Sequence, residues 1–240
     1  MNIIAVTPFT GSEKLVAMTE DCIEQLLLCE LPNEATLRVV AVNNNASRGL
    51  GKIGDHPLVD ELRDDKNHGF GVGVNRGIDL ALIGERWPCD QILVFNNDLQ
   101  FPNRDWLTHL LREGEGRYVL SPRTDVTATV EACHPGPEDK SAQRVREVSA
   151  FCWLVPRAVV GAIETRWGFP LFCPQFSNYG SDDATAAILR GLYGETPFKV
   201  VHRSWVKHLK ARTANELGVK AGTKELLTSL KKWKSASKLK

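Results

Sequence analysis

The sequence predicts an α/β protein with a mostly parallel central sheet flanked by helices. Short apolar runs alternate with helical patterns through the first 112 residues, as strands and helices do in such sheets. Three of these runs end in polar residues, and 42% of the 240 residues are hydrophobic against 25% charged, so the chain can bury a full core. Disorder across most of the chain is thereby excluded.

The strands and helices of the first half follow a regular order. Three short apolar runs predict buried strands, over residues 3–7, 37–42 and 92–95. Apolar residues spaced three and four apart predict the helices that follow them, over residues 15–29, 74–83 and 102–111.

The second half is less regular. Residues 121–146 are polar and contain three prolines, which predicts a long surface loop that could act as a lid. Around it we expect a strand, an aromatic loop, a helix and a last strand, over residues 148–155, 170–179, 182–192 and 198–202.

Composition also limits the cellular setting. No apolar run approaches the ~20 residues of a membrane-spanning helix, and a secretory leader is not recognisable, so we expect a cytoplasmic protein. Six cysteines stand far apart without a CxxC pair, which predicts buried, reduced thiols rather than a zinc site or a disulfide framework.

The charge is unevenly distributed. Residues 199–240 carry 12 basic and 2 acidic residues, whereas residues 1–198 carry 18 basic and 27 acidic ones. A basic amphipathic helix is expected within residues 213–240, with Leu226, Leu227, Leu230 and Trp233 on its apolar face. This tail is suited to an anionic membrane surface, which would make the protein peripheral, or to DNA. Packing against the domain, or simple solvation, is the plainer alternative.

Acidic residues mark two candidate sites for chemistry. Asp98 directly follows a buried strand, at the edge of a parallel sheet where ligands bind. Its carboxylate could hold Mg²⁺ or Mn²⁺, with the remaining ligands from a diphosphate and water, although Asp is also an ordinary turn residue. Asp182 and Asp183 begin a predicted helix, where acids also complement the helix dipole.

A glycine-rich segment lies between these strands. The glycines from Gly69 to Gly77 lack the spacing and the position of a dinucleotide-binding fingerprint. They remain suited to a close approach between the backbone and a ligand.

These segments, in this order, resemble the family 2 glycosyltransferases of the GT-A fold, of the rhamnosyltransferase-like, non-processive kind. Residues 67–78 (NHGFGVGVNRGI) are similar to the family's N-x-G-F-x-x-G-x-N-x-G-I segment. Residues 92–107 (ILVFNNDLQFPNRDWL) are similar to its strand, its D-x-D-type metal motif and the Pro-x-x-x-Trp-Leu that follows. Looser matches are VVAVNNNAS at 39–47, the acidic helix at 179–194 and Val-x-His at 206–208.

The resemblance implies a fold and an activity. The fold is a single GT-A-like domain over residues 1–212, with a donor half (1–100) and an acceptor half (101–212), before the tail. The activity is an inverting, metal-dependent transfer of one sugar from a nucleotide-diphosphate sugar, UDP- or dTDP-linked, to a hydroxyl of a glycan or lipid-linked acceptor. The sequence has no Q-x-x-R-W segment, which argues against a processive synthase.

The resemblance also implies roles for individual residues. Asp98 would hold the Mn²⁺ or Mg²⁺ ion, and His208 would be a second ligand or a diphosphate contact, with His202 competing for that role. Asp183 would be the general base, next to Asp182 where a glutamate is usual. The other residues would border the donor: Thr7, Pro8, Asn43, Asn67, Gly69, Asn75, Asn96 and Asn97.

The sequence departs from the family pattern at charged positions. Asn43 replaces the usual Asp, and Asn96 and Asn97 leave the metal motif acidic only at its last position. Because Asn keeps hydrogen bonding but drops charge, we expect a metal held weakly until the diphosphate arrives. Glycosylation of a modified DNA base and a noncatalytic nucleotide-sugar-binding role are alternatives. A nucleotidyltransferase is a third, without a basic, glycine-rich loop after the first strand to support it.

Overall fold

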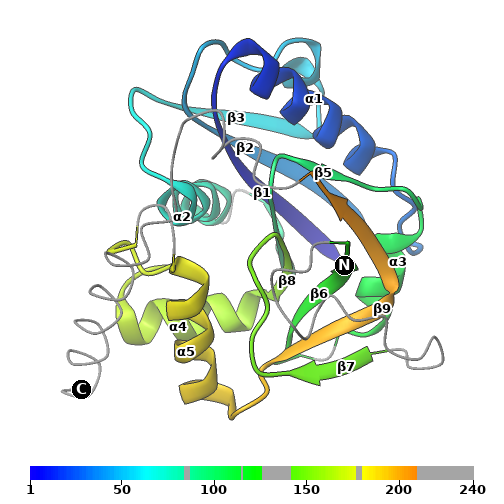
Figure 1. The fold of residues 1–240 in the computed structure, drawn as a ribbon, viewed down its shortest axis with the longest axis vertical. Helices are drawn as coiled ribbons and strands as arrows, with labels where there is room; N and C mark the ends of the chain where they lie inside the picture. The colour runs from blue at the N-terminus through cyan, green and yellow to red at the C-terminus, as the bar shows by residue number, and fades with distance from the viewer. Residues whose placement is uncertain (84–86, 115, 126–141, 177–179, 210–240) are drawn as a thin grey trace.

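The computed structural model describes residues 1–83, 87–114, 116–125, 142–176 and 180–209, which form one mixed sheet between two helical layers (Figure 1). The strands are β1 (Asn2–Gly11), β2 (Thr36–Ala46), β3 (Val59–Asp64), β4 (Gln91–Phe95), β5 (Leu99–Gln100), β6 (Val119–Thr124), β7 (Ala142–Val145), β8 (Cys152–Pro156) and β9 (Phe198–His208). The helices are α1 (Glu13–Leu27), η1 (Lys52–Asp55), α2 (Phe70–Leu82), α3 (Trp106–Arg112), α4 (Arg157–Trp167) and α5 (Ser181–Tyr193). The predicted α/β class is confirmed.

The sheet has the strand order β3-β2-β1-β4-β8-β6-β9-β5, with β7 also paired to β9. Strands β1 to β4 are parallel, as their continuous apolar runs predict for strands covered on both faces. The second half is mixed: β8 runs antiparallel to β4 and β6, and β9 runs parallel to β6 but antiparallel to β5 and β7. The strongly parallel part of the sheet is therefore its N-terminal half.

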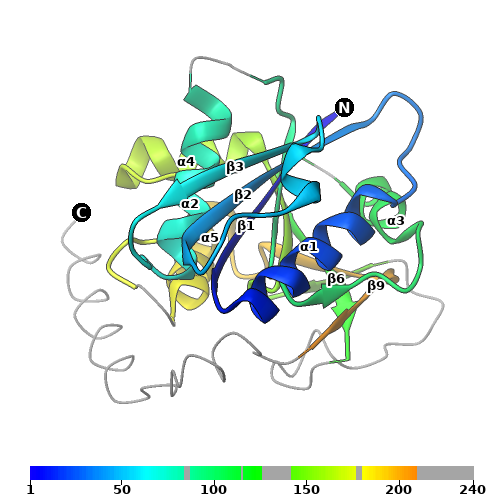
Figure 2. The same ribbon diagram turned by 90° about the horizontal axis from the view of Figure 1, so that it is seen from above.

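The helices cover both faces of the sheet. Helices α1 and α3 lie on one side, and α2, α4 and α5 on the other, in both views (Figures 1 and 2). One hydrophobic core runs through both halves of the chain, from Ile3 to Val206. Its largest fully buried side chains are Trp106 and Trp153. No helix within the described ranges is long and apolar enough to cross a membrane.

Several predicted boundaries need correction. The loop expected at 121–146 is wrong at both ends, because β6 extends to Thr124 and β7 begins at Ala142. Its middle, 126–141, lies outside the described residues, as do Tyr179 and the tail at 213–240 with its expected amphipathic helix. The last strand extends to His208 rather than ending at His202.

Candidate functional site

Parallel strands β1, β2 and β4 end at one edge of the sheet, which we call the carboxyl edge. In parallel α/β sheets this is the edge at which ligands bind. Strand β9 ends there too, because it runs parallel to β6 and its last residue, His208, pairs with Leu99 of β5 directly after β4. The segments at 43–47, 96–98 and 206–208 therefore lie on one side of the molecule.

The carboxyl edge brings Asp98 and His208 together. The His208 Nε2 atom lies 3.0 Å from the Asp98 Oδ1 atom and 3.2 Å from the Asn96 Nδ2 atom. Asp98 is only 3% exposed, and the His208 ring stacks on Phe151 at 6.0 Å between ring centres. A histidine nitrogen and a carboxylate oxygen thus contact each other directly at this edge.

The histidine beside Asp98 is His208 and not its competitor His202. His202 is buried in β9, where the pairing with β6 jumps from Val201 to Trp205. His202 therefore lies six residues before the end of the strand at the carboxyl edge.

The Asp98–His208 pair is chemically suited to Mn²⁺ or Mg²⁺. Such cations accept one or two protein ligands and complete their coordination with phosphate oxygens and water, and imidazole is a common transition-metal ligand. Among the described residues no group of three or more His, Cys, Asp or Glu side chains could hold a metal. A metal at this point would thus depend on a bound anion for its other ligands.

The two asparagines before Asp98 have different positions. Asn96 faces His208, and its backbone N–H donates to the Phe151 carbonyl at 2.8 Å. Asn97 is buried, and its Nδ2 donates to the Thr19 hydroxyl on α1 at 2.9 Å, away from the Asp98–His208 pair. Asn97 thus ties the strand end to α1, and its predicted role at the donor stays a prediction.

The glycine-rich segment lets α2 pack directly on the strand ends. Gly69 begins the helix with φ +83°, and the side-chain Oδ1 of Asn67 accepts its N–H at 2.8 Å. A Cβ at Gly73 would lie 2.8 Å from both the Pro8 Cβ and the Asn44 Nδ2. The glycines thus allow a close approach of α2 to the protein's own strands, and the predicted approach to a ligand stays a prediction.

Asn75 joins the two halves of the chain. Its Nδ2 donates to the Phe172 carbonyl at 2.6 Å, and its Oδ1 accepts the N–H groups of Leu171 and Phe172. Because these bonds occupy the amide, Asn75 fixes the 171–172 segment against α2. Its predicted place in the donor pocket stays a prediction.

Two buried polar atoms at the strand ends have no hydrogen-bond partner among the described residues. They are the Thr7 Oγ1 and the Asn44 Oδ1. Buried polar groups are normally hydrogen-bonded, so such exceptions indicate strain or an absent ligand. The resemblance implies Thr7 beside the nucleobase of the donor but does not single out Asn44. The position of Asn44 between Asn43 and Asn45 at the strand end could have indicated it.

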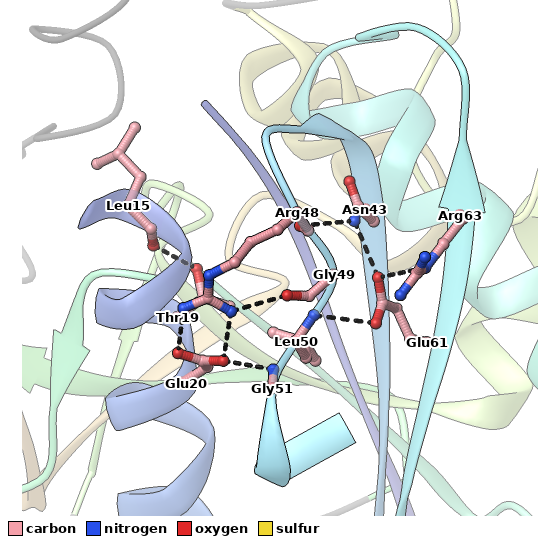
Figure 3. Close-up of polar contacts among 10 residues, drawn as sticks. All are labelled: Leu15, Thr19, Glu20, Asn43, Arg48, Gly49, Leu50, Gly51, Glu61 and Arg63. Carbon is pink, nitrogen blue, oxygen red and sulfur yellow. Dashed lines mark hydrogen bonds and ion pairs between the residues drawn. The ribbon is translucent and has the colours of Figure 1, made fainter. Parts of the chain in front are cut away.

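Asn43 holds the loop that follows β2, residues 46–51, which we call the 46–51 loop (Figure 3). Its Oδ1 accepts the Ala46 N–H at 2.7 Å, and its Nδ2 donates to the Arg48 carbonyl at 3.2 Å and to the Glu61 Oε1 at 2.9 Å. The Glu61 Oε2 in turn accepts the Leu50 N–H at 3.0 Å.

Glu20 on α1 holds the same loop from the opposite side (Figure 3). Both of its oxygens accept from the Arg48 guanidinium at 2.8 Å, and Oε1 also accepts the Gly51 N–H at 2.5 Å. The hydrogen bond from Arg48 lowers the pKa of Glu20 despite its partial burial. The loop is therefore fixed between two carboxylates from neighbouring elements.

Asp182 and Asp183 begin α5, as predicted, but differ in exposure. The Asp182 Oδ1 accepts the Asp183 N–H at 3.1 Å, and burial raises the pKa of Asp182, while a bond from the Ala150 N–H opposes the shift. Asp183 is exposed. Of the two carboxylates, Asp182 thus fastens the helix start and Asp183 faces outward.

A short series of contacts links α5 to the Asp98–His208 pair. The Ala150 N–H lies close enough to Asp182 to lower its pKa, the next residue Phe151 accepts the Asn96 N–H, and Asn96 contacts His208. The two acidic segments that the sequence singled out are therefore connected through residues 150–151.

Sequence reasoning missed Asp125 and Glu61. The Asp125 Oδ1 accepts the His208 N–H at 3.0 Å, which places a second carboxylate next to that histidine. Asp125 fell within the predicted loop, although the preceding apolar run Tyr118–Leu120 was a strand signal. Glu61 lies on β3, whose charged sequence gave no such signal.

No family model and no curated protein matches the sequence. Solved structures do match. Mannosyltransferase PcManGT from Pyrobaculum calidifontis, in complex with GDP-Man and Mn²⁺, has a TM-score of 0.61 and 14% identity, over 88% of this chain and 57% of its own. S. aureus TarS 1-349 in complex with UDP-GlcNAc has a TM-score of 0.65 and 13% identity, over 95% and 64%.

A third similar structure is glucosyl-3-phosphoglycerate synthase from Mycobacterium tuberculosis in complex with Mn²⁺, UDP and phosphoglyceric acid. It has a TM-score of 0.61 and 14% identity, over 95% of this chain and 77% of its own. The chain spans less than two thirds of the mannosyltransferase and of TarS 1-349. These likenesses show that the chain has the GT-A fold.

Proposed function

We propose that the protein is an inverting glycosyltransferase that moves one sugar from a nucleotide-diphosphate sugar to a hydroxyl acceptor. The observation that carries the proposal is the Asp98–His208 pair, 3.0 Å apart at the carboxyl edge of a GT-A fold. The similar structures with bound GDP-Man, UDP-GlcNAc or UDP support it through their fold. UDP- and dTDP-sugars are the proposed donors.

Asp98 and His208 would hold a Mn²⁺ or Mg²⁺ ion, and Asn96 would orient the imidazole. The bound ion supplies Lewis-acid stabilisation of the charge that develops on the departing diphosphate. The two Asn residues of the motif reduce its charge, so we propose that the nucleotide and the metal bind together.

Asp183 is the proposed general base. Its carboxylate accepts the acceptor's hydroxyl proton while that oxygen bonds to the anomeric carbon, and the bond from this carbon to the diphosphate breaks. Attack from the face opposite the leaving group inverts the anomeric configuration. Asp182 acts as a positioning residue, because its bonds to Ala150 and Asp183 set the start of α5.

The strand ends and the α2 start form the proposed nucleotide side of the site. Thr7, Pro8 and Asn44 border the base. The Thr7 Oγ1 and Asn44 Oδ1 are buried without a hydrogen-bond partner in the described part of the chain and would supply polar atoms for the ligand. Asn43 acts by holding the 46–51 loop, and Asn67 by fixing Gly69 at the start of α2.

Thermal unfolding with UDP, GDP and dTDP, with and without Mn²⁺, tests the proposal. A ligand at about 100 times its dissociation constant adds about 2.7 kcal/mol to the free energy of unfolding. We expect one base to stabilise the protein in a Mn²⁺-dependent manner. Failure of all three nucleotides with the metal would overturn the assignment.

A noncatalytic nucleotide-sugar-binding protein is the second candidate. It is favoured by the metal motif, in which only Asp98 is acidic. Release of nucleoside diphosphate from the donor, through hydrolysis or transfer of the sugar, separates the two functions. An enzyme releases it, and a binding protein does not. The acceptor is proposed to be a glycan or a lipid-linked glycan; a modified DNA base is proposed from the basic tail alone.

A further inference from the structure

The amide at position 43 is matched to a carboxylate on the next strand. The Asn43 Nδ2 lies 2.9 Å from the Glu61 Oε1, so an amide donor meets a charged acceptor. A carboxylate in place of this amide would put two acidic groups against each other, which disfavours ionisation of both. The negative charge that the family pattern has at the end of β2 is thus carried here by Glu61 on β3.

Glu61 is held in place by three donors. It accepts from Asn43 and the Arg63 Nε through Oε1 and from the Leu50 N–H through Oε2. Its side chain is 11% exposed, against 69% for Arg63. The Glu61 carboxylate is therefore a largely buried anchor, and Arg63 covers it from the solvent.

The 46–51 loop rests directly on this anchor. The Leu50 N–H of the loop donates to the Glu61 Oε2, and a Cβ at Gly49 would lie 3.0 Å from the Glu61 Oε1, so the loop backbone packs closely on this carboxylate. A displacement of Glu61 is therefore transmitted to the backbone of the loop, which follows β2 at the carboxyl edge.

We propose that Glu61 is a positioning residue of the nucleotide site and acts with Asn43 as one unit. The pair sets the position of the 46–51 loop beside the base of the bound nucleotide. This inference rests on the proposed function for its ligand, but the matched amide and carboxylate are a property of the fold itself.

Exchange of the two groups tests the unit. Asn43→Asp opposes two carboxylates, and Glu61→Gln leaves one of its donors without an acceptor, so each should weaken nucleotide affinity by about tenfold. In the double variant the amide on β3 can donate to the carboxylate on β2 and still accept the Leu50 N–H, although the bonds of Asn43 to the Arg48 carbonyl and of Arg63 to Glu61 are lost. We therefore expect the double variant to bind more tightly than Asn43→Asp, in titrations with the stabilising nucleotide and Mn²⁺.

Asp60→Asn is the matched control, because it removes the neighbouring carboxylate of β3. The Asp60 carboxylate pairs with Arg38 of β2 at 2.9 Å and not with Asn43. The nucleotide affinity of this variant should equal that of the wild type. A double variant no tighter than Asn43→Asp overturns the inference, and so does an unchanged affinity in Glu61→Gln. If Asn43→Asp does not fold, a double variant that folds supports the unit, and one that does not fold overturns it.

Hydrogen exchange separates this inference from the proposed function. The Leu50 N–H should be protected in the wild type and the double variant, and less protected in each folded single variant, without any ligand. If the wild type binds no nucleotide but shows this pattern, the proposed function fails and the Asn43–Glu61 unit stands. An unprotected Leu50 N–H in the wild type overturns the unit.

Discussion

The side chains of Asp98 and His208 meet at 3.0 Å although the two residues are 110 positions apart in the sequence. Asp98 follows β4 in the parallel half of the sheet, and His208 ends β9 in the mixed half. Folding of both halves is therefore required before the pair exists.

Asp98→Asn should weaken Mn²⁺-dependent binding of the nucleotide diphosphate by about tenfold or more, because a charged ligand to the metal is lost. Calorimetric titration with and without Mn²⁺ measures the effect. Asp105→Asn is the control, since Asp105 also contacts a histidine, His109, at 3.0 Å, but on α3. Equal affinities for wild type and Asp98→Asn in Mn²⁺ would contradict the metal assignment.

Asp183→Asn should lower turnover by ~10² to 10⁴ and leave nucleotide affinity unchanged, because a general base acts on the acceptor and not on the donor. Steady-state turnover and a separate nucleotide titration measure the two effects. Retained turnover, or lost binding, would remove Asp183 from the catalytic role.

Asn75→Ala should destabilise the protein by about 2 to 4 kcal/mol, because it leaves buried N–H and C=O groups of residues 171–172 without partners. Urea denaturation measures the free energy of unfolding. The exposed Asn67 makes a side-chain bond to the Gly69 N–H, so Asn67→Ala should cost clearly less. Equal losses in the two variants would argue against the link between α2 and residues 171–172.

Gly77→Ala should destabilise the protein by about 1 to 3 kcal/mol, because the added Cβ would lie 2.4 Å from the Val6 Cγ1 and the chain would have to shift. Gly191→Ala, on α5, meets no atom within 4 Å and should stabilise the protein by about 0.5 to 1 kcal/mol through helix propensity. Chemical denaturation of both variants checks the opposite signs. A neutral Gly77→Ala would show that α2 packs less closely on β1.

The contribution of Glu20 to stability should depend on pH. Its folded pKa is lowered below the usual 4.5, chiefly by the hydrogen bond from Arg48, so folding favours the ionised form. The stabilisation is therefore present above pH 4.5 and is lost as the pH falls through the folded pKa. The difference in unfolding free energy between wild type and Glu20→Gln should shrink across that range. A difference independent of pH would exclude an ionised Glu20–Arg48 pair.

The parallel half of the fold was predictable because each of its main strands is a continuous apolar run. Strand β3 was not, since it lies at the sheet edge with charged residues at 60, 61, 63 and 64, which an edge strand tolerates. Strand β6 was missed because it contains Pro122, which argues against a strand. Helix α4 was missed because it begins at Arg157 directly after β8, so no turn residues separate the strand pattern from the helix pattern.

The positions of the candidate site residues were predictable where a residue stands at a strand end or a helix start, and less so where contacts between distant segments decide. Asp98 and the acidic pair at 182–183 stood out from their positions after a strand and at a helix start. The choice of His208 over His202 depends on the irregular pairing of β9 with β6, which no local pattern reveals. The hydrogen bonds of the Asn43 and Asn75 side-chain amides likewise depend on partners distant in the sequence, Glu61 and Phe172.

The contacts through Ala150 and Phe151 give the start of α5 and the strand end at Asn96 a common backbone support. A shift of α5 would therefore act on the same residues that hold Asn96, the neighbour of His208. Under the proposed function, an acceptor bound at α5 would in this way influence the donor site without a larger rearrangement of the sheet.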